Sequence, residues 1–497
     1  MILRKLLPIF FLSLSCSAIA QYRDTLCFIQ INDIYEINAL QGGKSGGIAR
    51  VATFIQSCKK RYPTYSFIAG DFLSPSVMGT AVVDGERLSG KQMIDGLNTI
   101  GIDYATFGNH EFDIGEIALQ KRIDESKFVW FSSNVKRSDG LPFYKNSVGL
   151  KKYFPASINI ISPQKEFSVS LFSLTLPSNT PPYSRFYQYD SILKPIIPTL
   201  RKKKTMVMGL THLSATEDID LLENYPDIRL IMGGHEHENM YLASSHKSFV
   251  AKADANGKSV YKHLIYKNKK NNLEVRSELI KIDESIEPDP KVIPIVQNWE
   301  EKVYGAFRKQ GMEPTRNVCF LTDTLNGMES SIRYEQNSMG YAVNRALTLQ
   351  AGADASFINA GAIRIDDKVF GPITELDVIR IMPFGNKIVE VEMKGELLEK
   401  MIKTNNDRKG LGGYLQYSSN IKYHNESVFL NDSRIENEKI YRIRTIEFLL
   451  SGKELKLEYF TPSNPLIYRV IPVMNDAKEQ LDLRMAFIQD LKSKYNQ

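Results

Sequence analysis

The chain has 497 residues, of which 43% are hydrophobic and 24% are charged, and its formal net charge is +6. This composition is that of an ordinary globular protein and excludes disordered and fibrous proteins. A chain of this length exceeds what one hydrophobic core usually supports, so we expect two domains. The densest basic runs, at 202–204 and 267–270, lack interleaved aromatic residues. They are typical of solvated faces and do not indicate a nucleic-acid polymer as partner.

The first twenty residues are typical of a secretory signal peptide. Arg4 and Lys5 precede an apolar run at 6–14, and Ala-Ile-Ala at 18–20 offers small residues to a signal peptidase. The run is too short to span a bilayer, so we expect residues 1–20 to be removed and the mature chain to be periplasmic or secreted. Cys16 permits a lipoprotein as the alternative, although residues 13–15 match a lipobox poorly.

Removal of the signal peptide changes both the charge and the cysteine content. Without Arg4 and Lys5 the net charge falls from +6 to +4, which suits an anionic substrate but does not identify it. Cys27, Cys58 and Cys319 remain. Three thiols do not make a disulfide framework, and at most one pair closes, with Cys27 and Cys58 as the candidates.

Apolar runs alternate with helical patterns through the first half of the chain. Strands are predicted at 26–31, 65–69, 104–107, 128–131, 168–174, 206–210 and 228–232, and helices at 48–60 and 92–100. This alternation predicts an α/β domain with a layered sheet over residues 21–285. A linker follows at 286–313, with a helix at 295–308, and residues 314–497 are expected to form a second, α+β domain.

Polar residues follow the carboxyl ends of five apolar runs. They are Asp33, Gly70-Asp71, Gly108-Asn109-His110-Glu111-Phe112-Asp113, Thr211-His212 and Gly233-Gly234-His235-Glu236-His237. In α/β sheets functional groups gather outside the carboxyl ends of strands, so these side chains are expected to meet. Carboxylate, amide oxygen and imidazole together suit Zn, Mn, Fe or Co. Two such ions about 3.5–4 Å apart can clamp a phosphoryl displacement.

These motifs are similar to those of the calcineurin-like metallophosphoesterases, and within them to the 5′-nucleotidase family, which includes periplasmic UDP-sugar hydrolases. The resemblance spans nearly the whole mature chain. It implies an N-terminal layered α-β-β-α domain and a C-terminal α+β substrate-binding domain. It also implies two divalent metal ions, held by Asp33, Asp71 and His237 at site one and by Asp71, Asn109, His212 and His235 at site two. By the same likeness, His110 stabilises the transition state and Asp113 orients its ring.

One position departs from the family pattern. The first family motif reads Asn-Asp-x-His, whereas Tyr35 stands here in place of the histidine. Three interpretations remain open: Tyr35 ligates as a phenolate and favours a harder ion, a water takes the place of the imidazole, or site one is weak and the protein is inactive. The second is favoured, because a phenol has a pKa of about 10 and ligation costs its proton.

The second domain carries the residues that the resemblance assigns to the substrate. Arg333 and Arg364 would bind an anionic group of the substrate, and Asn359 and Asn386 would bind its polar edges. Phe384 and Phe448 would stack on its base. Taken alone, phenylalanines such as these two are more often core residues, and the two arginines could form surface ion pairs. Departures occur here too, because Glu329 stands where the family can carry an arginine, and Glu454 lies in an altered loop at 451–455.

The sequence therefore predicts a metal-dependent phosphoric ester hydrolase. The main hypothesis is hydrolysis of a nucleoside 5′-monophosphate to nucleoside and phosphate, with metal-bound hydroxide as nucleophile. The alternatives are a 2′,3′-cyclic-nucleotide phosphodiesterase, a UDP-sugar hydrolase, and a non-catalytic two-lobed binding protein with a degraded metal site. The oligomeric state and the native metals stay open.

Overall fold

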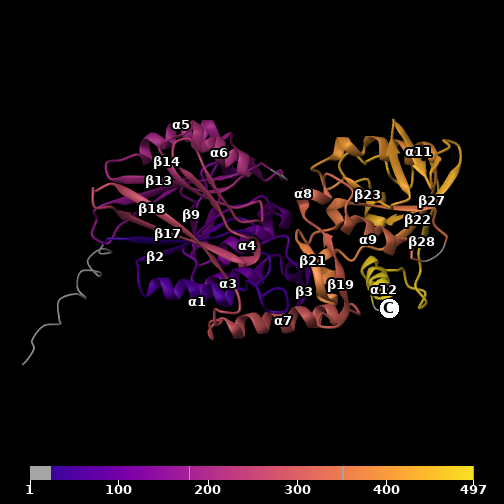
Figure 1. The fold of residues 1–497 in the computed structure, drawn as a ribbon, viewed down its shortest axis with the longest axis horizontal. Coiled ribbons are helices and arrows are strands. Elements are labelled where there is room, and N and C mark those ends of the chain that lie inside the picture. Colours follow the sequence, from indigo (N-terminus) through magenta and orange to yellow (C-terminus); the bar gives the residue numbers. More distant parts are fainter. Residues whose placement is uncertain (1–23, 178–179, 350–351, 496–497) are drawn as a thin grey trace, which may run out of the picture. The chain divides into compact units, whose positions relative to one another are not determined.

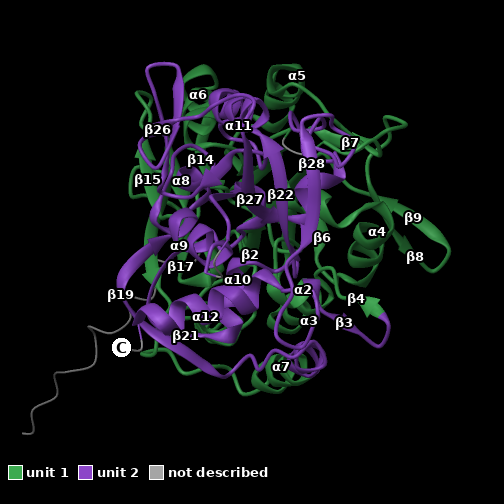
Figure 2. Ribbon diagram, turned by 90° about the vertical axis from the view of Figure 1, so that its right-hand side faces the viewer, with its two compact units in different colours: residues 1–79, 86–301 green, residues 80–85, 302–497 purple. Residues whose placement is uncertain are grey.

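The computed structural model describes residues 24–177, 180–349 and 352–495 (Figure 1). The predicted signal peptide and Cys16 lie outside these residues. Among the described residues, no helix is both long enough and apolar enough to cross a membrane. The chain forms two compact units, coloured separately in Figure 2: unit 1 contains residues up to 79 and 86–301, and unit 2 contains 80–85 and 302–497.

Unit 1 is built on two six-stranded sheets. The first has the order β18-β17-β1-β2-β5-β6 and contains β1 (Leu26–Ile31), β2 (Thr64–Ala69), β5 (Tyr104–Thr106), β6 (Val129–Trp130), β17 (Ser259–Lys267) and β18 (Leu273–Lys281). The second has the order β10-β11-β13-β14-β16-β15 and contains β10 (Ser157–Ile161), β11 (Ser168–Thr175), β13 (Thr205–His212), β14 (Ile228–Gly233), β15 (Met240–Ala243) and β16 (Phe249–Lys252). Strands β1, β2, β5 and β6 are parallel to one another, as are β11, β13, β14 and β16.

The core of unit 1 lies between the two sheets. Phe28 of β1, Phe67 of β2 and Met208 of β13 belong to one buried cluster. On the opposite face of the second sheet, Val207 packs in another cluster with residues of α5 (Tyr189–Leu200) and α6 (Ala215–Asn224). Neighbouring residues of β13 therefore point into different layers, as the two-residue period of a strand requires. Figure 1 shows α5 and α6 on one side of the sheets, with α1 (Ile48–Lys59) and α3 (Lys91–Ile100) on the other. The layered α-β-β-α fold is confirmed.

Most predicted elements of unit 1 form, with shifted ends. Strand β13 runs on to His212, so this histidine closes the strand instead of following it. The strands β16, β17 and β18 were not predicted. In β18 exposed charged residues alternate with half-buried ones, so no apolar run marks it. The pair β17–β18 nevertheless completes the first sheet, because β17 pairs antiparallel with β1.

Unit 2 has a mixed fold, as expected for an α+β domain. Its five-stranded sheet has the order β23-β20-β27-β22-β28, formed by β20 (Ala355–Asn359), β22 (Ile388–Lys394), β23 (Leu415–Tyr417), β27 (Ile440–Ile446) and β28 (Ile467–Pro472). Smaller sheets pair β19 (Asn317–Asn326) with β21 (Lys368–Thr374) and join β24 (Ile421–His424), β25 (Ser427–Leu430) and β26 (Ser433–Arg434). The helices are α8 (Glu329–Ile332), α9 (Ser338–Leu347), α10 (Glu375–Ile381), α11 (Gly395–Lys403) and α12 (Leu483–Tyr495). The predicted connecting helix is α7 (Ile293–Arg308).

The three remaining cysteines are buried and carry free thiols in the described part of the chain. Cys27 of β1 and Cys58 of α1 are hydrogen-bonded to each other, and this contact lowers the pKa of the Cys58 thiol to about 7. A disulfide between them remains a prediction.

Candidate active site

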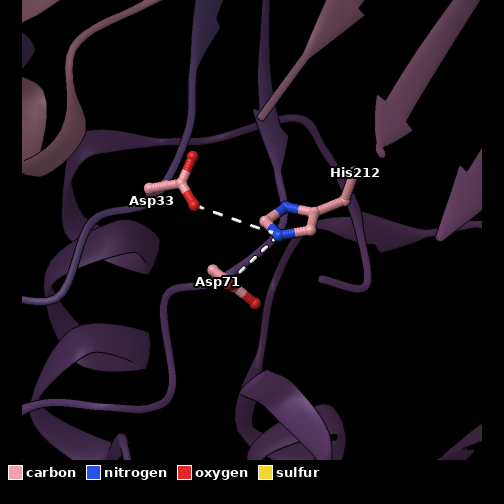
Figure 3. Close-up of side chains that lie close together, drawn as sticks. All are labelled: Asp33, Asp71 and His212. Atoms are coloured by element: carbon pink, nitrogen blue, oxygen red, sulfur yellow. Dashed lines mark ion pairs between the residues drawn. The ribbon is translucent and has the colours of Figure 1, made fainter. Parts of the chain in front are cut away.

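Three potential metal ligands meet where β1, β2 and β13 end. The ligand atoms of Asp33, Asp71 and His212 all lie within 4.8 Å of one another, and all three side chains are buried (Figure 3). His212 Nε2 is 3.1 Å from Asp71 Oδ2 and 4.0 Å from Asp33 Oδ1. Because the three residues come from different strands in two sheets, the layered fold itself produces this cluster.

A hydrogen bond at Nδ1 fixes the orientation of the His212 ring. Its Nδ1 donates a hydrogen bond of 2.7 Å to the carbonyl oxygen of Ala69, the last residue of β2 in the facing sheet. In a neutral ring, Nε2 then carries the lone pair and faces the two carboxylates. The backbones also approach closely here, since a Cβ on Gly108 would lie 2.1 Å from Asp71 Oδ1.

The other predicted ligands surround the same cluster. His237 Nε2 lies 3.4 Å from Asp33 Oδ1, and the His235 ring centroid lies 5.5 Å from that of His212. Asn109 is buried, and the backbone N–H of the next residue, His110, donates a 2.8 Å hydrogen bond to Asp71 Oδ1. The structure therefore brings Asp33, Asp71, His212, His235 and His237 to one place, and buries Asn109 next to His110, whose backbone binds Asp71.

The donor set fits divalent cations. Asn109 Oδ1 is buried without a hydrogen-bond partner among the described residues, and a neutral His212 would face the Asp71 carboxylate at 3.1 Å with an unpaired Nε2. Both atoms are acceptors when His212 is neutral. Buried acceptors without donors are rare in folded proteins, because an unpaired buried polar group costs about 1–3 kcal/mol. A cation satisfies them all, and carboxylate, amide and imidazole donors are those that the predicted metals accept.

Four of these residues have an unusual backbone conformation. The φ angles are positive at Asp33 (52°), Asp71 (54°), His235 (91°) and His237 (61°). Residues other than glycine avoid this region, and each such conformation costs on the order of 1–3 kcal/mol. Such strain gathers where the surrounding fold must aim a functional side chain.

The charges within the cluster favour the ionised forms of the Asp33 and Asp71 carboxylates. Burial alone would raise the pKa of Asp33 and Asp71, but the adjacent His212 ring holds both pKa values below their usual range. Burial would likewise lower the pKa of His212, yet Asp71 and Asp33 raise it to about 9. In the metal-free protein a proton on His212 therefore substitutes for part of the positive charge that a cation would supply.

Glu111 organises the backbone around Asp71, which sequence reasoning did not foresee. This fully buried carboxylate accepts four backbone N–H groups: those of Asp71 (2.8 Å), Phe72 (2.8 Å), Leu73 (3.1 Å) and Gly108 (2.6 Å). Burial and the nearby Asp71 charge raise its pKa to about 7. The only indication of this role in the sequence was that Glu111 belongs to the motif Gly-Asn-His-Glu. The motif does not reveal which backbone N–H groups the carboxylate accepts.

Lys252 forms a second unforeseen support, at the end of β16. Its buried Nζ donates to the carbonyl oxygens of Leu213 (2.6 Å) and Gly234 (2.8 Å), next to His212 and His235 in sequence. It also pairs with Asp218 (2.9 Å) and with Glu236. One ammonium group therefore ties together the ends of β13 and β14. A lone lysine after Phe249-Val250-Ala251 was the only sequence signal.

The two predicted catalytic residues form a pair. His110 Nδ1 lies 2.7 Å from Asp113 Oδ2, and the His110 side chain is 8% exposed. A carboxylate on Nδ1 fixes the ring and makes Nε2 the nitrogen that can address a ligand.

The predicted substrate residues lie in unit 2. Asn359 Nδ2 donates a 2.7 Å hydrogen bond to Glu454, and Arg333 Nη1 lies 2.8 Å from Glu329. Phe384 and Phe448 are 51% and 40% exposed, so neither is a core residue. No aromatic contact joins them in the described part of the chain. The backbone N–H of Arg364 donates to the Ile381 carbonyl oxygen, and the carbonyl oxygen of Asn386 accepts from the Leu483 N–H; substrate binding by these two side chains stays a prediction.

The layered fold and the donor set define a calcineurin-like metallophosphoesterase. Residues 27–239 match the family model of the calcineurin-like phosphoesterases. Residues 318–461 match that of the 5′-nucleotidase C-terminal domain. The chain thus belongs to the 5′-nucleotidase family of calcineurin-like metallophosphoesterases, and it is a metal-dependent phosphoric ester hydrolase.

Individual relatives agree with this placement. The protein UshA of Salmonella pullorum is 24% identical over 443 residues, which cover 76% of this chain and 77% of that protein. A 5′-nucleotidase of Vibrio cholerae is 23% identical over 444 residues, covering 78% of this chain and 74% of the relative. The crystal structure of a 5′-nucleotidase precursor from Thermus thermophilus superposes with a TM-score of 0.69 at 20% identity, covering 94% and 96% of the two chains. That superposition supports the fold.

Proposed function

We propose that this enzyme hydrolyses nucleoside 5′-monophosphates to nucleoside and phosphate, using two divalent ions that share Asp71. The observation that carries the proposal is the cluster of buried acceptors around Asp71, whose Oδ2 lies 3.1 Å from His212 Nε2. Asp33 and His237 would complete one site, and Asn109, His212 and His235 the other. When bound there, divalent ions would lower the pKa of a water and offset negative charge on the phosphoryl oxygens.

The protein's own groups complete the chemistry. His110 would donate from Nε2 to a phosphoryl oxygen as negative charge grows there, while Asp113 holds Nδ1 at 2.7 Å. Glu111 fixes the backbone on either side of the bridging carboxylate through the N–H groups of Asp71 and Phe72. Lys252 fixes the two histidine-bearing strand ends. These contacts keep the ligands in place before the substrate arrives.

Unit 2 would recognise the rest of the nucleotide. The exposure of Phe384 and Phe448 suits stacking on a base, which is worth roughly 1–3 kcal/mol and depends little on base identity. Arg333 would bind an anionic group, but Glu329 already pairs with its guanidinium at 2.8 Å. Glu454 raises the local negative charge further. This balance predicts weaker recognition of anionic groups than two unpaired arginines would give.

The same proposal includes the compartment. The signal-like residues 1–20 support export to the periplasm or the medium. The identity of the first residue of the expressed protein, read by mass spectrometry, tests cleavage after Ala20. A mature chain that begins at Cys16 would support the lipoprotein alternative instead.

Chromatography of the products identifies the substrate, because AMP would give nucleoside and phosphate, whereas 2′,3′-cyclic AMP would give a nucleoside monophosphate and UDP-glucose would give UMP and a sugar phosphate. Purified protein is loaded with Mn²⁺ or Zn²⁺ and assayed on AMP, 2′,3′-cyclic AMP and UDP-glucose, with Asp71→Asn as the inactive control. The proposal predicts the largest kcat/KM on AMP. A larger value on 2′,3′-cyclic AMP or UDP-glucose would support the phosphodiesterase or sugar-nucleotide alternative. Inactivity on all three would contradict nucleotide chemistry.

A further inference from the structure

Tyr35 occupies the position in which the related enzymes are expected to place a histidine, and its hydroxyl lies inside the metal-ligand cluster. Tyr35 Oη is 2.9 Å from His237 Nε2, 3.2 Å from Asp71 Oδ2 and 3.4 Å from Asp33 Oδ1. These three residues are the proposed ligands of site one. The Tyr35 side chain is only 7% exposed, so it reaches this position within the protein and not from solvent.

The spacing of these atoms matches the corners of one coordination shell. Metal–ligand bonds to N and O are about 2.1 Å, so neighbouring ligands are about 3.0 Å apart at right angles and about 3.4 Å apart at a tetrahedral angle. The distances from Tyr35 Oη span 2.9–3.4 Å, and the fourth edge, from His237 Nε2 to Asp33 Oδ1, is 3.4 Å. The single hydroxyl proton can serve only one of the two carboxylates at a time, whereas one cation can bind both of them together with Tyr35 Oη and His237 Nε2.

The backbone holds Tyr35 in this position. Asn256 Oδ1 accepts the backbone N–H groups of Tyr35 (3.0 Å) and Glu36 (3.2 Å), and the Asn256 N–H donates to Asp33 O (2.8 Å). The neighbouring Ala255 N–H donates to His237 O at 3.0 Å. The same short segment therefore fixes both the tyrosine and the histidine that its hydroxyl contacts.

From this geometry we infer that Tyr35 Oη is a direct ligand of site one, replacing the expected imidazole with an oxygen. The bound ion takes the place of the hydroxyl proton, which leaves to solvent. Site one then has three oxygen ligands and one nitrogen, whereas site two has two histidines. Site one consequently favours a harder ion than site two. This inference rests on the proposed two-ion function and revises the expectation that a water fills the position.

Metal binding tests the inference without reference to turnover. Zn²⁺ affinity is measured by chelator competition, with bound metal counted by mass spectrometry, for the wild type, Tyr35→Phe and Tyr35→His. Tyr261→Phe is the matched control, since that buried tyrosine donates to the Met240 carbonyl at 3.2 Å and touches none of the proposed ligands. We expect Tyr35→Phe to weaken one of two sites at least tenfold. The histidine and control variants should retain two ions.

Iron provides a spectroscopic signature that a structural role would not produce. Wild-type protein loaded with Fe³⁺ should show visible phenolate-to-iron charge-transfer absorption, which Tyr35→Phe loses and Tyr261→Phe keeps. Two ions bound with wild-type affinity in Tyr35→Phe, together with an unchanged iron spectrum, would overturn ligation while leaving the proposed function intact. A wild-type protein that binds no metal would overturn both.

Discussion

Lys252→Met tests whether one buried ammonium group holds the two histidine-bearing strand ends together. The side chain is 1% exposed, and its removal leaves Asp218, Glu236 and two carbonyl oxygens without their cation. Breaking a buried pair by removing one partner costs about 3–5 kcal/mol. Burial already raises the pKa of Asp218 to about 6, so this carboxyl is readily protonated at lower pH. The loss in free energy of unfolding caused by Lys252→Met should therefore be about 3 kcal/mol at acidic pH and should increase above neutral pH.

Urea unfolding of the metal-free protein measures this cost, followed on the transition of unit 1 because the two units need not unfold together. Lys262→Met is the matched control, since its partner Glu278 is 50% exposed and such pairs contribute about 0–1 kcal/mol. Metal affinity should also fall in Lys252→Met, because Leu213 and Gly234 lose their common anchor. A loss of less than about 1 kcal/mol with wild-type metal affinity would refute the reasoning.

Three further predictions concern the reaction, the pH response and the substrate. His110→Ala should lower kcat on AMP about a hundred- to a thousandfold while the metal content stays at the wild-type level, and a parallel loss of metal would refute its assignment to the transition state. The pKa of His212 is raised to about 9, so its proton stabilises the metal-free fold fully below pH 6.5 and is lost as pH rises through about 9. The gain in melting temperature on adding metal should therefore grow across this window, and a pH-independent gain by calorimetry would contradict this. Glu329→Gln frees Arg333 and should lower KM for AMP up to about tenfold, or about 1.4 kcal/mol; an unchanged KM would exclude competition between Glu329 and substrate.

The sequence predicted where the ligands meet because their positions follow from strand ends. Asp33, Asp71 and His212 each end or follow an apolar run, and parallel strands deliver such residues to one edge. The unbroken apolar run at 206–210 is likewise typical of a strand buried on both faces, as β13 is. These features depend only on the local pattern of apolar residues and on the layered fold, and both can be predicted from the sequence.

The supports of the site could not be predicted in the same way. Glu111 lies within a recognisable motif, but its four backbone donors come from two loops that meet only in the folded chain. Lys252 ends a short strand with no distinctive pattern, and its partners are 16 to 39 residues away. For Tyr35 the sequence gives the residue type, whereas the direction of its hydroxyl depends on Asn256, over two hundred residues later.

The central claim is that Asp71 bridges two ions, and anomalous diffraction from crystals grown with Mn²⁺ tests it most directly. We predict two anomalous peaks about 3.5–4 Å apart, each within bonding distance of the Asp71 carboxylate. Asp33, Tyr35 and His237 should surround one peak, and Asn109, His212 and His235 the other. A single peak, or ions bound away from Asp71, would contradict the account.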